Sequence, residues 1–302
     1  MSNRSSTRVL ALLACWPPGP PLGLKRTAIS ETSTAQSGVT SSHSVTAGTC
    51  ACSDPNGRVS GRPTLGGYDR VMPERSPIPV ALVHGFATSC ARTWGDTGWL
   101  DLLADAGRPT IRIDLLGHGE SAKPHDPEAY EALEQLVFDQ LPDEPVDAVG
   151  FSLGARTLLA LASVHPERFR RLVVAGVGAN LFRHDGSSAL LADAISGHPE
   201  ADESPVGQYF RGLASQPGND PLALAACLRR LAPPLTNEGL AGITSPVLVV
   251  LGDQDFAGPP DPLVERLADP TLVVLRGVDH FATPKDFGFL DAGLEFLGAQ
   301  AP

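Results

Sequence analysis

The chain has 302 residues, of which 42% are hydrophobic and 19% charged, the balance of an ordinary globular protein of one or two domains. Its formal net charge of −11 argues against a nucleic-acid or anionic-membrane partner, because phosphate binding needs clustered lysine and arginine. No apolar run reaches the ~20 residues that a membrane helix requires, so we expect no stable membrane insertion.

The N-terminal 63 residues differ in composition from the rest. Residues 1–63 are dominated by Ser, Thr, Gly and Pro and show no apolar periodicity, which predicts disorder. Arg4 and Arg8 precede a short apolar run and Cys15, as in a lipoprotein-type export signal, but the run is at the lower edge of usable length. We expect a non-targeting tail or an over-extended reading frame, with export or lipid anchoring as the alternative, and a folded domain over residues 64–302.

The cysteines favour a reducing environment. The 5 cysteines are scattered and lack the paired spacing of a structural zinc site. The only close pair, Cys50 and Cys52, lies in the segment with no evident fold. We therefore expect reduced thiols, a cytoplasmic location, no metal and, since no dinucleotide fingerprint occurs, no organic cofactor.

The remainder of the chain predicts a parallel sheet. A first edge strand is possible at residues 65–71. Continuous apolar runs, typical of strands buried on both faces, follow at residues 79–86, 110–114, 146–149, 171–176, 246–252 and 271–275. Helical segments alternate with them, so we expect right-handed crossovers and an α/β fold with a mostly parallel central sheet flanked by helices.

Two of the helices are predicted from their caps. One begins at Asp126 and Pro127, and the closing helix begins at Thr283 and Pro284. Their buried faces are predicted to be Tyr130, Leu133, Val137 and Leu141 in the first, and Phe287, Leu290, Leu294 and Leu297 in the second.

A long insertion separates the fourth and fifth of the apolar runs. Residues 181–244 are too many for a crossover loop, and they contain helix-like segments at 205–215 and 220–231. We expect this insertion to form a small helical cap.

A sharp strand-to-helix turn is predicted around Ser152. This serine is the centre of Gly150-Phe151-Ser152-Leu153-Gly154, which joins an apolar run to a helix-like run. Glycines at the flanking positions let the backbone turn without side-chain collisions, so the hydroxyl is exposed. The pattern also occurs in ordinary turns, but strand and helix on either side favour a catalytic nucleophile.

Five motifs, in this order, resemble those of the α/β-hydrolase family from about Leu65 to the C-terminus. They are His84-Gly85-Phe86, similar to the oxyanion loop; 114–121, similar to the Asp-x-x-Gly-His-Gly-x-Ser turn; the turn at Ser152; 252–255, similar to the acid-bearing loop; and 277–281, similar to the histidine loop. Five co-linear matches are far rarer by chance than one. The resemblance implies an α/β-hydrolase fold with the chain order Ser, Asp, His.

His280 is the predicted base for Ser152. A serine hydroxyl is a weak nucleophile, and an imidazole has the proton affinity to activate it. His280 follows the last apolar run and precedes a capped helix, where this fold assembles its site. His84 and His118 are expected instead to support their own loops by hydrogen bonding.

A carboxylate should hold the imidazole in one tautomer. Asp255 is favoured because the family pattern places the acid three residues after the glycine, while Asp253 and Asp185 remain alternatives. The oxyanion is expected to bind the backbone N–H groups of Phe86 and Leu153, the latter at a helix N-terminus.

The substrate pocket is expected between the sheet edge and the cap. Its candidate walls, each equally plausible as core packing, are Phe86, Trp94, Phe151, Leu153, Phe182, Tyr209, Phe210 and Phe281. Arg156 and Arg183 could contact a carboxylate substrate, although solvated surface arginines are the more ordinary interpretation.

The residues favour acyl transfer to water from a small-molecule acyl substrate. Serine at position 152 disfavours the aspartate-nucleophile mechanism of related dehalogenases and epoxide hydrolases. We expect a hydrolase of carboxylic esters, lactones or thioesters, and lean to small neutral or apolar esters. Carbon–carbon cleavage, a lyase step or cofactor-free perhydrolysis is the second hypothesis, and a non-catalytic ligand-binding relative the third. The pattern leaves the oligomeric state open.

Overall fold

The computed structural model describes residues 77–183, 186–197 and 205–299. The predicted disordered segment 1–63 and the possible edge strand 65–71 lie outside these residues. Within these residues the central sheet has six strands: β1 (Val80–Val83), β2 (Thr110–Ile113), β3 (Val146–Phe151), β4 (Phe169–Ala175), β5 (Val247–Gly252) and β6 (Pro270–Leu275). Their spatial order is β2-β1-β3-β4-β5-β6, and every neighbouring pair is parallel, as the apolar runs predict.

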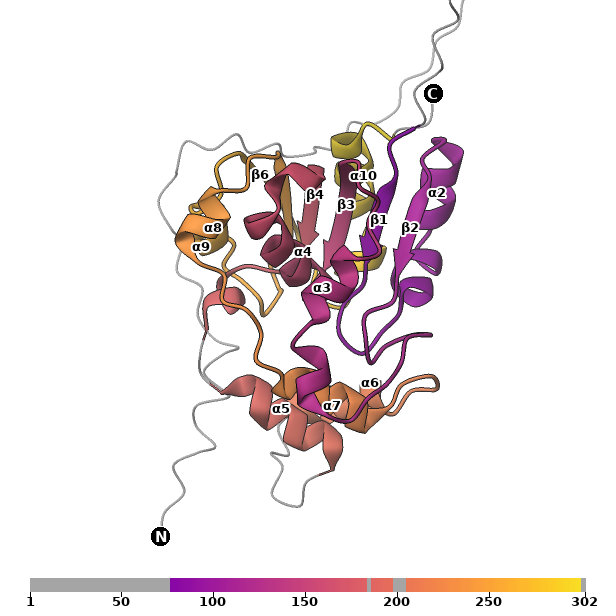
Figure 1. The fold of residues 1–302 in the computed structure, drawn as a ribbon, viewed down its shortest axis with the longest axis vertical. Helices are drawn as coiled ribbons and strands as arrows, with labels where there is room; N and C mark the ends of the chain where they lie inside the picture. The colour runs from indigo at the N-terminus through magenta and orange to yellow at the C-terminus, as the bar shows by residue number, and fades with distance from the viewer. Residues whose placement is uncertain (1–76, 184–185, 198–204, 300–302) are drawn as a thin grey trace, which may run out of the picture. The chain divides into compact units, whose positions relative to one another are not determined.

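Helices follow the strands along the chain (Figure 1). They are α2 (Trp99–Asp105), α3 (Leu133–Phe138), α4 (Leu153–Val164), α5 (Ser187–Ser196), α6 (Pro205–Ala214), α7 (Pro221–Arg229), α8 (Asn237–Ala241), α9 (Asp261–Val264) and α10 (Phe287–Leu297). Shorter helical turns are η1 (Ala91–Gly95), η2 (Pro127–Tyr130), η3 (Pro166–Arg168), η4 (Ala179–Phe182) and η5 (Thr283–Lys285). Among the described helices, none combines the length and apolar character needed to cross a bilayer.

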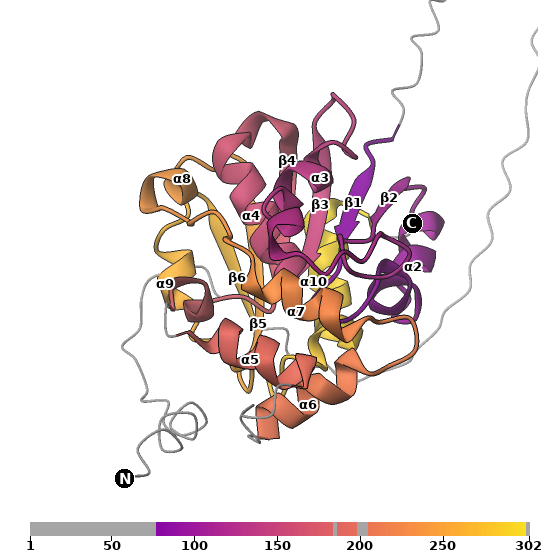
Figure 2. The same cartoon turned by 60° about the horizontal axis from the view of Figure 1, so that its bottom comes forward.

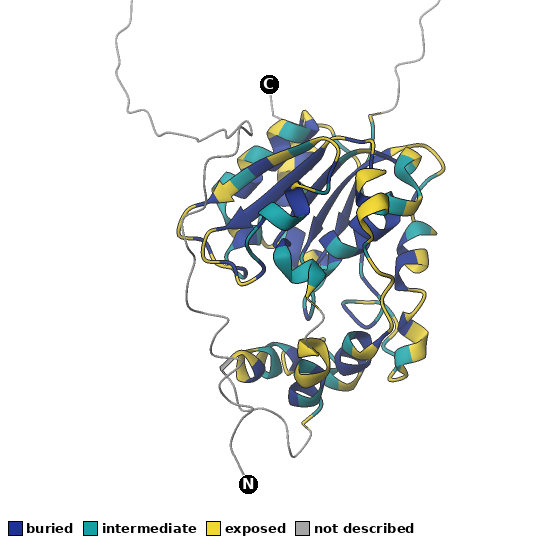
Figure 3. Cartoon of the chain, turned by 90° about the vertical axis from the view of Figure 1, so that its left-hand side faces the viewer, coloured by how far each residue is buried: buried dark blue, intermediate teal, exposed yellow. Residues whose placement is uncertain are grey.

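The sheet is covered on both faces, which is why the inner strands β1 and β5 are apolar and buried along their whole length. Ala81 and Val83 of β1 join a hydrophobic cluster with α3 and α4, whereas Val80 and Leu82 join another with α2 and α10. Figure 3 shows the buried strands between these helical layers.

The first capped helix is interrupted. Asp126 caps η2 by accepting a hydrogen bond from a backbone N–H at 3.0 Å, as predicted, but α3 begins only at Leu133. The predicted buried face serves two different clusters: Tyr130 packs against cap helix α7, while Leu133 and Val137 pack on the sheet. One straight helix does not reach both surfaces, so the chain turns between them.

The closing helix begins later than the sequence predicts. Asp286, not Thr283, accepts the capping hydrogen bond, and the Thr283 hydroxyl donates to the carbonyl of Asp279 at 3.0 Å. Phe287, predicted to be buried, is therefore at the first helical position and is 81% exposed, whereas Phe289 is fully buried.

The insertion between β4 and β5 contributes helices α5 to α8. Helices α5, α6 and α7 lie together beyond the carboxyl ends of the strands (Figures 1 and 2). Their facing side chains form a separate small cluster of Ala192, Ile195, Ala214, Leu224 and Ala225, joined by Ala87 from the loop after β1. This cluster places the three helices against the same loop that carries Phe86.

Candidate active site

Ser152 lies at the junction of β3 and α4 with a strained backbone, φ 51° and ψ −109°. A positive φ in a residue with a Cβ costs on the order of 1–3 kcal/mol, so the surroundings must enforce it. A Cβ on Gly150 would lie 2.7 Å from the backbone of Ala155, and one on Gly154 would lie 2.2 Å from the carbonyl oxygen of Val83. The start of α4 is thus pressed against β3 and β1, which only glycine permits.

Three side chains from distant segments form one hydrogen-bonded row. His280 Nε2 lies 3.0 Å from Ser152 Oγ, and Nδ1 lies 2.9 and 3.0 Å from the carboxylate oxygens of Asp255. An ionised carboxylate only accepts hydrogen bonds, so Nδ1 carries the proton and Nε2 presents its lone pair to the serine. Asp255 has no exposed side-chain surface and also accepts from the N–H of Ala257 at 2.8 Å. The alternative acid, Asp253, accepts instead from the backbone of the neighbouring loop.

Three phenyl rings contact the imidazole of His280. Their centroids lie 4.3 Å away for Phe256, 4.9 Å for Phe151 and 5.4 Å for Phe281. These contacts restrict rotation of the imidazole and leave it only 5% exposed. Sequence reasoning identifies Phe151 but misses Phe256, whose only signal is its position directly after Asp255.

The expected oxyanion-binding amides belong to segments that surround the serine. Leu153 is the first residue of α4, so its N–H has no partner within the helix. The N-terminus of a helix also favours negative charge. Phe86 follows β1, whose register places Val83 beside Gly150 at the end of β3.

Two fully buried histidines support the loop that carries Phe86. His84 Nδ1 donates to the carbonyl of the next residue at 2.7 Å, and its Nε2 accepts from the N–H of Leu115 at 3.0 Å. His118 Nδ1 donates to a nearby carbonyl at 3.0 Å, and its ring lies 5.6 Å from that of Phe86. Burial lowers the pKa of both imidazoles, that of His118 to about 3, so both are neutral near pH 7.

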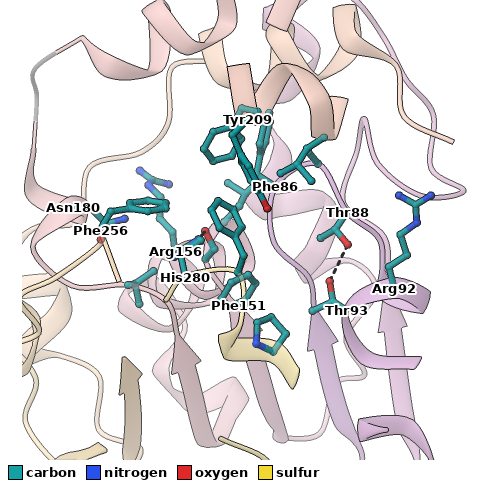
Figure 4. A pocket seen from close by; sticks show the side chains of 18 of the residues that line it. Phe86, Thr88, Arg92, Thr93, Phe151, Arg156, Asn180, Tyr209, Phe256 and His280 are labelled. Carbon is teal, nitrogen blue, oxygen red and sulfur yellow. Dashed lines mark hydrogen bonds between the residues drawn. The ribbon is translucent and has the colours of Figure 1, made fainter. Parts of the chain in front are cut away.

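A cavity of about 590 Å³ opens onto Ser152 and His280 (Figure 4). This volume is in the range of small-molecule sites. The predicted wall residues that line it are Phe86, Phe151, Leu153, Tyr209, Phe210 and Phe281. Further apolar lining that sequence reasoning misses includes Val177, Leu181, Leu191, Leu213, Leu228 and Phe256. Tyr209 stacks on Phe281 at 4.2 Å, so the cap helix α6 and the histidine loop share one aromatic wall.

Two predicted wall residues do not line this cavity. Trp94 is fully buried and packs against Trp99 and Phe289 on one face of the sheet, with ring centroids 5.6 and 6.4 Å apart. Phe182 has the guanidinium of Arg266 over its ring, 4.4 Å from the centroid. Both residues are aromatic and close in sequence to residues of the site, so only the tertiary packing shows that they do not line the cavity.

Both arginines on the cavity wall are engaged by the protein. Arg156 donates to Glu134 at 3.2 Å and to the carbonyl of Pro233 at 2.6 Å, and Arg230 pairs with the same carboxylate at 2.8 Å. Burial, followed by the nearby charge of Arg230, lowers the pKa of Arg156. Arg92 donates to the loop between α6 and α7 at 3.0 and 2.7 Å. The predicted candidate Arg183 donates to two backbone carbonyls.

The described cysteines and carboxylates do not suggest another chemistry. Burial raises the pKa of the Cys90 and Cys227 thiols to about 11, so both are protonated near pH 7. Within the described ranges, no group of three His, Cys, Asp or Glu side chains is arranged to hold a metal ion.

Comparison with known families agrees with this architecture. A family model described as alpha/beta hydrolase fold matches residues 78–196, which include β1 to β4 and Ser152. The crystal structure of the enol-lactonase from Burkholderia xenovorans LB400 matches with a TM-score of 0.54 at 24% identity, covering 74% of this chain and 92% of that one. The chain has the α/β-hydrolase fold.

Curated relatives include enzymes that act on different bonds. Pimeloyl-[acyl-carrier protein] methyl ester esterase of Neisseria meningitidis serogroup A is 29% identical over 70% of this chain and 75% of that protein. 2-Hydroxymuconate semialdehyde hydrolase of Pseudomonas putida is 39% identical over 33% of this chain. The match covers 36% of that hydrolase. A match to a putative 2-succinyl-6-hydroxy-2,4-cyclohexadiene-1-carboxylate synthase of Bacillus subtilis covers 35% of the synthase. These similarities agree with the fold and leave the activity of this chain to be proposed from its site.

Proposed function

We propose that this protein is a serine hydrolase that cleaves carboxylic esters, including lactones and thioesters, through an acyl-enzyme on Ser152. The proposal rests on the row from Ser152 through His280 to Asp255 at the floor of an apolar cavity. A ligand-binding module has no need of a buried imidazole aligned on a serine hydroxyl. Helices α5, α6 and α7 would act as the cap that closes the cavity over the substrate.

The reaction would proceed in two acyl transfers. Ser152 Oγ attacks the substrate carbonyl carbon while its proton passes to Nε2 of His280. The N–H groups of Phe86 and Leu153 stabilise the oxyanion, and Asp255 stabilises the imidazolium. Collapse of this intermediate breaks the bond to the leaving group, which takes the proton from His280. Water then attacks the acyl carbon, His280 accepts its proton and returns it to Oγ, and the acid departs.

The engaged arginines favour a neutral substrate. A substrate carboxylate in an apolar cavity needs a cationic partner, because burying an unpaired charge is costly. The guanidinium groups of Arg156 and Arg92 already donate to protein acceptors. The remaining basic side chain on the lining, Lys285, is exposed at its edge. Both guanidinium groups are thus oriented by the protein's own acceptors, which supports a neutral acyl group over an anionic one.

Hydrolysis of a carbon–carbon bond is the second candidate. It is supported by the similarity to 2-hydroxymuconate semialdehyde hydrolase, and the same three side chains could serve it.

Two assays on the folded protein test the proposal. A fluorophosphonate probe should label Ser152, and a short-chain p-nitrophenyl ester should release p-nitrophenol. Ser152→Ala should abolish labelling and lower turnover by about 10⁴ or more. Absence of both signals in the wild type would favour a binding protein. Turnover of a vinylogous 1,5-diketone without turnover of any ester would favour the second candidate.

A further inference from the structure

We infer that Asn219, in the loop between cap helices α6 and α7, is a positioning residue for this reaction. Its side chain holds the backbone of the oxyanion loop, so that the Phe86 N–H is aimed at the reacting carbonyl. The inference rests on the proposed function, because it takes the Phe86 N–H as one of the two oxyanion donors.

The oxyanion loop is strained next to Phe86. Among the described residues, only Ala87 and Ser152 combine a side chain with a positive φ, and that of Ala87 is 57°. A left-handed conformation in alanine is unfavourable, because its Cβ crowds the backbone. Without an external restraint, Ala87 would rotate to a negative φ and the adjoining backbone of Phe86 would move with it.

Asn219 supplies such a restraint. Its Nδ2 donates to the carbonyl oxygen of Ala87 and to that of Leu213, both at 2.9 Å. Carbonyl oxygens only accept, so the amide nitrogen must face them and both of its N–H groups are used. One side chain therefore ties the strained residue of the oxyanion loop to the end of α6.

The contact is partly buried and is reinforced by its neighbours. The Ala87 side chain is 2% exposed and packs into the small cluster formed by α5, α6 and α7. Arg92, which follows the same loop, donates to Gln216 and Pro217, on the Asn219 side of the cap (Figure 4 shows Arg92 at the cavity edge). The loop 216–219 is thus hydrogen-bonded to the segment 87–92 at both ends of that segment, at Ala87 and at Arg92. Assembly of the cap and orientation of the oxyanion donor are in this way coupled.

A purely structural role for Asn219 predicts a different outcome from a positioning role. An oxyanion donor acts on the transition state far more than on bound substrate, so its misplacement lowers kcat and leaves KM nearly unchanged. A loosened cap would instead weaken substrate binding and raise KM.

The test compares variants on a short-chain p-nitrophenyl ester. Asn219→Ala should lower kcat by about 3- to 10-fold, the loss of one neutral hydrogen bond, with KM within about twofold. Asn219→Asp, which keeps the side-chain volume but cannot donate, should lower kcat at least as much and serves if the alanine variant fails to fold.

The double variant Asn219→Ala with Ala87→Gly best distinguishes a positioning role of Asn219 from a purely structural one. Glycine adopts a positive φ without steric cost, so it should recover part of the lost kcat. If Asn219 merely stabilises the cap, removing the buried Ala87 methyl would instead reduce activity and melting temperature further. Arg229→Ala is the matched control, because Arg229 bonds Asp193 and Ser196 within the cap and does not line the cavity. It should keep kcat and KM within about twofold of the wild type.

The outcomes separate this inference from the function on which it rests. An active wild type with unchanged kcat in both folded Asn219 variants, or a double variant worse than Asn219→Ala, would overturn the positioning role alone. A folded wild type that hydrolyses no ester would overturn the proposed function and the positioning role together.

Discussion

Lowering the pH from 7 to 5 should destabilise the fold through His118. In the folded state its Nδ1 donates to a carbonyl, while Nε2 is buried without a partner among the described atoms. Protonating Nε2 would place a charge in an apolar site next to His84, and burial accordingly lowers the pKa of His118 to about 3. In the unfolded chain a histidine has a pKa of about 6.5.

The sign and size of the effect follow from these two values. The folded pKa is below the unfolded one, so the unfolded state binds more protons as the pH falls, and stability is lost from about pH 6.5 downward. At pH 5 the folded imidazole is still neutral, and the free energy of unfolding should be lower than at pH 7 by about 2 kcal/mol, roughly 1.4 kcal/mol for each pH unit below 6.5. The lowered pKa of His84 acts in the same direction.

Urea unfolding at pH 7 and pH 5 measures this loss. The His118→Asn variant removes the titrating ring, so it should be less stable than the wild type at pH 7 but should lose about 2 kcal/mol less on acidification. If the variant shows the same difference between the two pH values as the wild type, His118 is not the group responsible.

Three further predictions concern single substitutions. Asp255→Asn should lower kcat/KM by about 10⁴, because the imidazole loses its tautomer partner, whereas Asp253→Asn should cost less than about tenfold; the reverse order in ester kinetics would move the acid. Gly154→Ala should prevent folding or Ser152 labelling, since its Cβ would meet a carbonyl oxygen at 2.2 Å, and a normally labelled variant would contradict the close packing of the elbow. Phe289→Ala should lower the free energy of unfolding by about 3–5 kcal/mol and Phe287→Ser by less than about 0.5 kcal/mol; equal effects would contradict the register of α10.

The strands and the turn at Ser152 can be predicted from the sequence because they depend on local chemistry. Six continuous apolar runs each overlap most of a strand, since a strand between two helical layers has little surface left for polar residues. The glycines around Ser152 identify the sharp turn for a similar reason, because the backbone contacts they permit exclude any Cβ. The resemblance of residues 252–255 and 277–281 to the acid and histidine loops of the α/β-hydrolase family predicts the pairing of Asp255 with His280.

Other features depend on contacts between segments far apart in the chain, and composition carries no trace of them. Trp94 and Phe151 are both aromatic residues close in sequence to predicted site residues. Trp94 nevertheless packs against Trp99 of α2, whereas Phe151 lines the cavity. Phe287, expected to be buried, is exposed because the helix is capped by Asp286 and begins later, and local patterning does not reveal this start.

The sequence alone determined the strands, the turn at Ser152 and the order of the three candidate catalytic residues, since each depends on a residue and its immediate neighbours. The tertiary structure decided which aromatic side chains line the cavity, that Arg156 is already bound by Glu134, and that Asn219 reaches Ala87. Those contacts join residues more than 20 positions apart, and their geometry exists only once the cap has packed against the loops at the end of the sheet.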